Sequence, residues 1–206
     1  MKRIICFWSV LFFPASAVFA QADSVNAVQE IMKFQRELNE QYRDQKKSPL
    51  EPGDFTQFKQ HDFFPIDLRY RVAATVELTP RAKFFKMKTS AGIDQDYRTW
   101  GIATFELMGK KMKLSLYQSR RLMNDPEYKD YIFLPFTDGT NGSSTYGGGR
   151  YIGLRMPTSG NTLIIDFNQA YNPYCAYSKR YACPIVPAEN NLDVDILAGI
   201  RLELHE

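Results

Sequence analysis

The sequence is poor in the residues that most metal and catalytic centres use. Its 206 residues include two histidines, His61 and His205, and three cysteines, Cys6, Cys175 and Cys183. A zinc site with three histidine or four thiolate ligands therefore cannot form within one chain. No Gly-x-Ser-x-Gly motif is present, and a Ser or Cys triad would have to use His61 as its base. We expect no metal site, and the sequence identifies no cofactor.

The chain also lacks a run of basic residues. Lys2 and Arg3 precede an apolar run over residues 4–13, and Val18-Phe19-Ala20 is a small-residue cleavage pattern, so residues 1–20 are predicted to be a signal peptide. Its removal would lower the formal net charge from +3 to +1, which argues against nucleic acid as a partner. No later stretch supplies the ~20 apolar residues of a membrane span. We therefore expect a periplasmic or secreted protein with no membrane span after cleavage.

The start of the mature chain has helical periodicity. Val28, Ile31, Leu38 and Tyr42 are spaced three, four or seven apart and are separated by charged residues. This pattern predicts an amphipathic helix within residues 21–46. Two prolines and a glycine in residues 48–53 end it.

Residues 47–206 are predicted to form one β domain, because the hydrophobic period changes to two. The hairpin turn between the third and fourth strands is expected at Met108-Gly109. The expected strands cover residues 67–78, 83–89, 98–107, 110–118, 131–136, 151–156, 162–167 and 192–198. Repeated short strands predict a mainly β fold, a single antiparallel barrel or sandwich with an N-terminal amphipathic helix.

Glycine is concentrated in one segment. Seven of the 12 glycines lie between Gly139 and Gly160, and three in a row precede Arg150. Backbone N–H groups near Gly148 could approach an anion, with Asp138 beside it and Arg150 supplying a bidentate charge. The alternative is a tight turn in which Arg150 makes a structural ion pair with Asp138 or Asp166.

Tyrosine is concentrated just after it. Asn172, Tyr174 and Tyr177 lie in a loop that also contains Tyr171. Such tyrosines could form the walls of a binding pocket, with apolar faces and hydrogen-bonding hydroxyls. Alternatively, they pin an ordered loop to the β domain.

Cys175 and Cys183 are eight positions apart in a chain expected to be exported. This favours a structural disulfide, which would contribute about 2–3 kcal/mol on the chain-entropy model. Free thiols, buried or reactive, are the main alternative, and a metal-binding pair is a lesser one.

Glu189 and Asn190 follow a proline shortly before the last predicted strand. Glu189 could be a general base or a calcium ligand, with Asn190 as a neighbouring ligand contact. The alternative is a cap on a turn.

Several of these segments resemble a bacterial family known as domain of unknown function 1684. The resemblance rests on residues 64–67, 133–138, 145–152, 166–177, 183–184 and 187–190, and Asn-Pro-Tyr-Cys-Ala-Tyr is its most distinctive part. It runs from about Lys47 to the C-terminus. It implies that the glycine–arginine segment and the tyrosine–cysteine loop belong to one pattern, and it supplies no activity.

Three functions remain open. The first is an exported binding module for a small polar or anionic ligand, built from the candidates above. The second is a structural or interaction protein without a small-molecule site. The third is a hydrolase-like enzyme that uses Glu189 or Asp138 as acid or base, or Cys175 as nucleophile.

Overall fold

The computed structural model describes the backbone of residues 15–202 and the side chains of residues 23–202. Residues 1–14 of the predicted signal peptide lie outside the described residues. In the described part, no helix is both long and apolar enough to cross a membrane.

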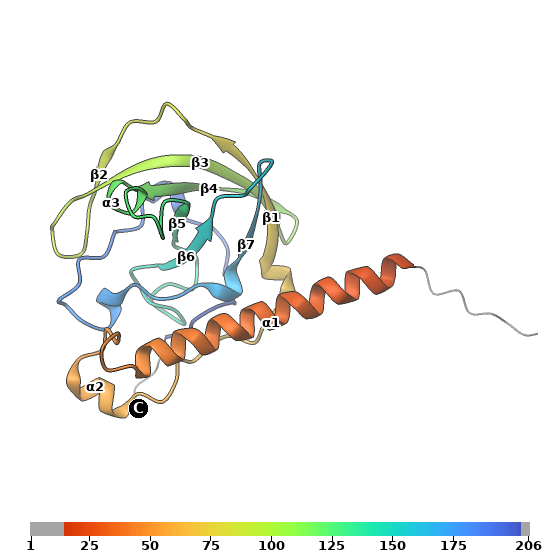
Figure 1. The fold of residues 1–206 in the computed structure, drawn as a ribbon. Coiled ribbons are helices and arrows are strands. Elements are labelled where there is room, and N and C mark those ends of the chain that lie inside the picture. Colours follow the sequence, from red (N-terminus) through yellow and green to blue (C-terminus); the bar gives the residue numbers. More distant parts are fainter. Residues whose placement is uncertain (1–14, 203–206) are drawn as a thin grey trace, which may run out of the picture.

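The fold is mainly β, as predicted. Seven strands form one antiparallel sheet in the order β6-β5-β4-β3-β1-β7, and β2 pairs with β3. The sheet curls into a half-barrel, so the sandwich alternative is not formed (Figure 1). The strands are β1 (Arg71–Leu78), β2 (Phe85–Met87), β3 (Gln95–Leu107), β4 (Lys110–Ser119), β5 (Tyr131–Phe136), β6 (Arg150–Arg155) and β7 (Thr162–Asp166).

The β3–β4 hairpin turns at the predicted position. Leu107 pairs with Lys110, and Met108 and Gly109 both have positive φ, 50° and 76°. Two residues with positive φ match the right-handed twist of the flanking strands. This local chemistry accounts for the agreement between prediction and structure.

The strand β5 is buried on both of its faces. Ile132, Leu134 and Phe136 enter the main hydrophobic core, whereas Tyr131 and Phe133 point to a second, aromatic cluster. A strand covered on both sides needs apolar residues at successive positions rather than an alternating pattern. The sheet therefore has two cores, and the second one forms the site described below.

The helix α1 (Ala15–Arg43) packs along one side of the half-barrel (Figure 1). Its start at Ala15 lies before the position expected from sequence. Ala27, Ile31 and Tyr42 are buried on its inner face. The short elements are α2 (Pro52–Gln57), α3 (Arg120–Met123), η1 (Leu68–Tyr70), η2 (Phe167–Gln169), η3 (Tyr174–Ala176) and η4 (Ala188–Asn190).

Residues 192–198 are not a strand, so the prediction of a last strand was wrong. Leu192, Ile196 and Ala198 are buried, which explains their alternation. Some of their backbone groups, however, form hydrogen bonds with side chains instead of with a neighbouring strand. The guanidinium of Arg150 binds the carbonyls of Ile196 and Ala198, and the carboxylate of Asp138 accepts from the N–H of Ile196.

Candidate functional site

Arg150 is a structural residue in this fold. Its side chain is fully buried, and Nη2 lies 2.8 Å from Oδ2 of Asp138. Nη1 donates to the carbonyls of Ala198 and Ile200 at 2.5 and 3.2 Å. Arg150 and Asp138, for which a ligand-facing role was one prediction, form a buried ion pair in this structure. The pair ties the C-terminal segment to the sheet.

The glycine-rich segment is a compact turn beside this ion pair. The hydroxyl of Thr140 donates to Asp138 and contacts the hydroxyl of Thr145 at 2.8 Å. Gly148 makes room for an aromatic ring, since a Cβ there would lie 2.5 Å from the ring of Tyr146. The role of Gly148 in the structure is to let Tyr146 fold over its own turn.

Asn190 bridges two strands. Its Nδ2 donates to the carbonyls of Ser115 and Pro135, and its Oδ1 accepts from the N–H of Ser115. Pro135 has no N–H, so the β4–β5 ladder opens there, and the buried amide of Asn190 closes the gap. Asn190, predicted as a ligand contact, makes structural hydrogen bonds here.

Glu189 lies exposed on η4, next to Asn190. Its carboxylate accepts a hydrogen bond of 2.8 Å from the hydroxyl of Tyr117. Burial, and then this bond, raise the pKa of Tyr117. Because the raised pKa keeps the proton on the hydroxyl of Tyr117, proton transfer from Tyr117 to Glu189 is unfavourable.

The second aromatic cluster encloses a cavity of about 410 Å³, which we call the tyrosine cavity. It lies against β3, β5 and β6 and is covered by the loop that follows β7. Its tyrosines are Tyr97, Tyr128, Tyr131, Tyr151, Tyr171, Tyr174 and Tyr181. Gln95, Arg121, Leu122, Phe133, Pro173, Ala182, Cys183 and Pro184 complete the lining. This volume falls within the usual range for small-molecule sites.

Burial keeps Tyr97, Tyr131 and Tyr151 of this cavity protonated at physiological pH. Burial raises the pKa of Tyr97 to about 12 and also raises the pKa values of Tyr131 and Tyr151. The hydroxyl of Tyr151 donates to the carbonyl of Pro184, and those of Tyr131 and Tyr171 lie 3.4 Å apart. The walls thus offer aromatic faces and phenolic hydroxyls.

Arg121 is the charged member of this lining. It belongs to the exposed end of α3 and has no ion pair among the residues that the structure describes. Its neighbour Arg120 is engaged, since its guanidinium lies over the ring of Phe84 and near Asp96. The cavity therefore combines neutral aromatic walls with one available cation.

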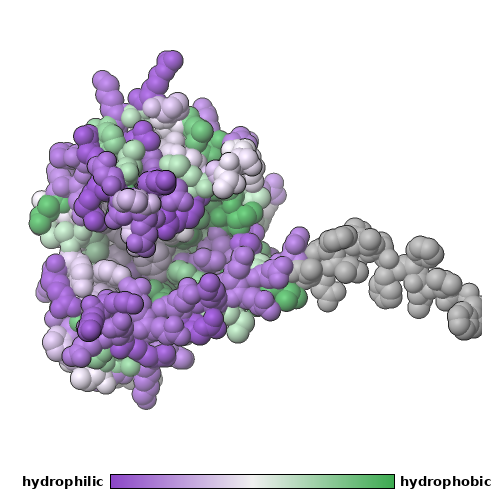
Figure 2. Space-filling view, viewed as in Figure 1, coloured by the Kyte–Doolittle hydropathy of each residue, from purple (hydrophilic) through white to green (hydrophobic). Residues whose placement is uncertain are grey.

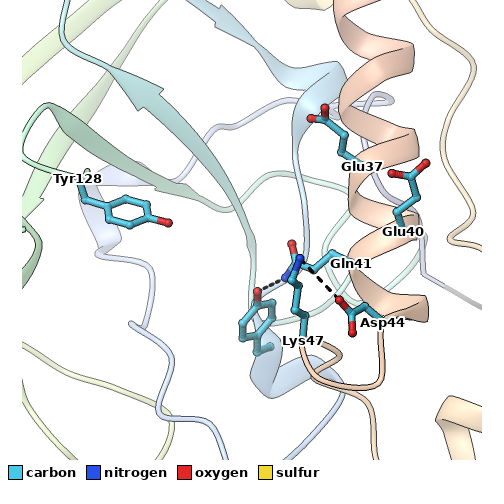
Figure 3. A pocket seen from close by; sticks show the side chains of 7 residues that line it. Glu37, Glu40, Gln41, Asp44, Lys47 and Tyr128 are labelled. Atoms are coloured by element: carbon cyan, nitrogen blue, oxygen red, sulfur yellow. Dashed lines mark hydrogen bonds and ion pairs between the residues drawn. The ribbon is translucent and has the colours of Figure 1, made fainter. Parts of the chain in front are cut away.

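A second cavity of about 730 Å³ adjoins the first, because Tyr128 and Tyr174 line both. Figure 2 shows the molecule hollowed between the sheet and α1. In Figure 3, Glu37, Glu40 and Gln41 project from α1, and Tyr128 faces them from the other side. This outer cavity is polar and acidic.

The predicted loop tyrosines divide between two roles. Tyr171 and Tyr174 line the tyrosine cavity, and the hydroxyl of Tyr174 accepts a hydrogen bond from Gln41 of α1. Tyr177 instead packs on Tyr42 with ring centroids 5.1 Å apart. Asn172 is buried and donates to the Tyr177 hydroxyl at 3.0 Å. Asn172 and Tyr177 thus hold the loop on α1, whereas the alternative interpretation expected it to be pinned to the β domain.

Cys175 and Cys183 are adjacent and not joined by a disulfide in this structure. The N–H of Cys175 lies 3.1 Å from Sγ of Cys183. Cys183 lines the tyrosine cavity, and Cys175 directly follows Tyr174. Within the described residues, no group of three or more His, Cys, Asp or Glu side chains is placed to hold a metal ion.

Sequence reasoning missed most of the cavity. Tyr97, Tyr131 and Tyr151 lie on three strands that are distant in sequence, and Arg121 follows β4. One signal was present: residues 131–136 are aromatic or apolar throughout, which is typical of a strand buried on both faces. That signal indicates a second covered face but does not identify which residues cover it.

The fold and this cavity define a class: a β half-barrel with a helix packed beside it and an aromatic cavity against β3, β5 and β6. The chain belongs to the family described as protein of unknown function DUF1684, which matches residues 56–201. This confirms the resemblance inferred from the sequence motifs. The lining of the tyrosine cavity lies entirely within the matched residues.

A solved structure shares the fold. The solution NMR structure of the uncharacterized protein from gene locus rrnAC0354 of Haloarcula marismortui is 29% identical, with a TM-score of 0.72. The similarity covers 90% of this chain and 99% of that chain. Such coverage extends beyond the family match into the segment that contains α1. No curated protein matches the chain.

Proposed function

We propose that this protein binds a small planar or aromatic molecule with an anionic group in the tyrosine cavity. The observation that carries the proposal is Arg121, the charged residue in a lining rich in tyrosine. Aromatic walls favour a planar apolar body, and phenolic hydroxyls orient its polar atoms. Guanidinium groups bind carboxylates through paired N–H donors.

The signal-like pattern of residues 1–20 supports a protein that acts after export, in the periplasm or outside the cell. The proposal does not depend on this location. It assigns the ligand-binding charge to Arg121 and not to Arg150, because the guanidinium of Arg150 is buried and already paired with Asp138.

The proposal is tested by calorimetric titration with two probes of one shape, 2-naphthoate and naphthalene-2-carboxamide. We expect the carboxylate to bind the native protein about threefold to tenfold more tightly than the carboxamide. The gain is this small because Arg121 is exposed, so solvent and salt screen its charge. In Arg121→Gln this preference should disappear while the carboxamide keeps its affinity.

A second variant tests the location. Ala182→Trp introduces a large side chain at a residue of the cavity lining and should weaken both probes, whatever their charge. Arg120→Gln is the matched control for Arg121→Gln and should leave the preference unchanged, because Arg120 lies outside this lining. Equal binding of both probes by the native protein would refute the anionic part of the proposal.

A further inference from the structure

Cys175 and Cys183 lie eight positions apart in the segment that follows β7. Cys175 belongs to η3, in the loop after β7, and Cys183 lies beside the segment that follows β2. The two thiols share a side-chain hydrogen bond, and the N–H of Cys175 also points at Sγ of Cys183. Two sulfur atoms in this arrangement can exchange a proton and form a bond.

The backbone of Cys183 is held by hydrogen bonds through both its N–H and its carbonyl. Its N–H donates to Oγ of Ser90 at 3.1 Å, and its carbonyl accepts from the N–H of Ser90 at 2.9 Å. A bridge between Thr89 and Pro184 extends this contact. Cys183 is buried, whereas Cys175 is only partly buried. An incoming reagent therefore meets Cys175 first.

The surroundings of Cys175 favour its thiolate. The thiol of Cys183 and the hydroxyl of Tyr146 donate hydrogen bonds toward it. These donors, with Cys183 the largest cause, lower the pKa of Cys175 to about 6 despite partial burial. The same bond and burial raise the pKa of Cys183. At neutral pH, Cys175 is thus the nucleophile and Cys183 keeps its proton.

We propose that Cys175 and Cys183 form a thiol–disulfide exchange pair that reacts with small disulfides of the glutathione or cystine class. The Cys175 thiolate attacks one sulfur of the disulfide, whose S–S bond breaks and releases one small thiolate. That thiolate takes the proton of Cys183. The sulfur of Cys183 then attacks Cys175 and releases the second small molecule, which takes up a proton from water.

The electrons balance over the two steps. The small disulfide is reduced to two thiols, and the two cysteines are oxidised to one disulfide. The ring so closed spans residues 175–183, on the wall of the tyrosine cavity. The exchange itself does not depend on ligand binding there, so it goes beyond the proposed function.

The test uses the full chain with Cys6→Ser, which removes the third thiol. The reduced protein is mixed with glutathione disulfide, quenched with acid at intervals and analysed by mass spectrometry with peptide mapping. We expect a transient glutathione adduct on Cys175, followed by a product lighter than the reduced protein by two hydrogen atoms. Added dithiothreitol should restore the reduced form.

Three variants assign the roles. Cys183→Ser should stop at the adduct on Cys175, and Cys175→Ser should react at least about tenfold more slowly. Tyr146→Phe keeps both thiols but removes one donor, so its first step should slow at pH 7. The matched control is Tyr70→Phe in the main core, which should react like the parent.

Two results would overturn the proposal. One is an adduct that forms equally fast on Cys175 and Cys183 and never resolves. The other is a preformed disulfide that dithiothreitol leaves intact in the folded protein, which would make the bond a permanent structural one.

Discussion

The carboxylate of Asp138 lies 2.8 Å from the guanidinium of Arg150, and neither side chain is exposed to solvent. Three backbone carbonyls and one N–H of the C-terminal segment also bond to this pair. A segment whose sequence alternates like a strand is therefore held by side chains instead of a neighbouring strand. Burying these charges is costly, and the many bonds offset the cost.

We predict that Asp138→Asn lowers the free energy of unfolding by about 3–5 kcal/mol, because it leaves a buried guanidinium without its counter-charge. Urea unfolding followed by circular dichroism measures the change. The control is Asp130→Asn, which breaks the exposed pair with Arg155 at 2.6 Å. Exposed pairs contribute little, so this variant should unfold close to the parent. Equal midpoints for both variants would contradict the structural role of Arg150.

Asn190 offers a second stability test. Asn190→Ala removes the amide that serves the N–H and carbonyl of Ser115 and the carbonyl of Pro135. We expect a loss of about 2–4 kcal/mol, since buried backbone groups lose their partners. The neighbouring Asn191→Ala removes an exposed bond to Thr137 and should cost less than about 1 kcal/mol. Similar losses for both variants would rule out the bridging role of Asn190.

The reactivity of Cys175 should depend on pH in an unusual range. Because its pKa is lowered to about 6, the rate of iodoacetamide labelling should rise through pH 6 and be level above pH 7. An ordinary thiol, with a pKa near 8.5, still gains reactivity there.

The lowered pKa of Cys175 also makes the stability of the fold depend on pH. The ionised Cys175 stabilises the fold at a pH above the pKa of the unfolded thiol, and this contribution is lost as the pH falls through about 6. Tyr146→Phe should move the labelling midpoint upward, and Tyr70→Phe should not. A midpoint above pH 8 in the parent would be incompatible with the assigned hydrogen bonds.

The fold was largely predictable because its signals are local. The turn at Met108-Gly109 depends only on the backbone conformation of these two residues. In β1, the alternation of apolar and polar residues indicates one buried face. Residues 192–198 show what such a pattern cannot predict. Their alternation of apolar and polar residues indicates which side chains are buried. It does not indicate that Arg150, rather than a neighbouring strand, binds their backbone carbonyls.

The candidate site was less predictable for a related reason. A buried arginine and a ligand-binding arginine look alike in sequence, so both roles stay open for Arg150, and nothing in the sequence points to Arg121. Tyr171 and Tyr174 were found because they are clustered in one loop. Tyr97, Tyr131 and Tyr151 come together only through the pairing of distant strands.

The central claim is that the tyrosine cavity binds an aromatic anion. It is tested most directly by NMR of the full chain, with carbon-13 in the tyrosine rings, during titration with 2-naphthoate. The rings of Tyr97, Tyr131, Tyr151 and Tyr171 should shift together along one binding curve, while Tyr70, in the other core, stays in place. The account would be contradicted if these four signals stayed fixed at saturating probe, or if Tyr70 moved as far as they did.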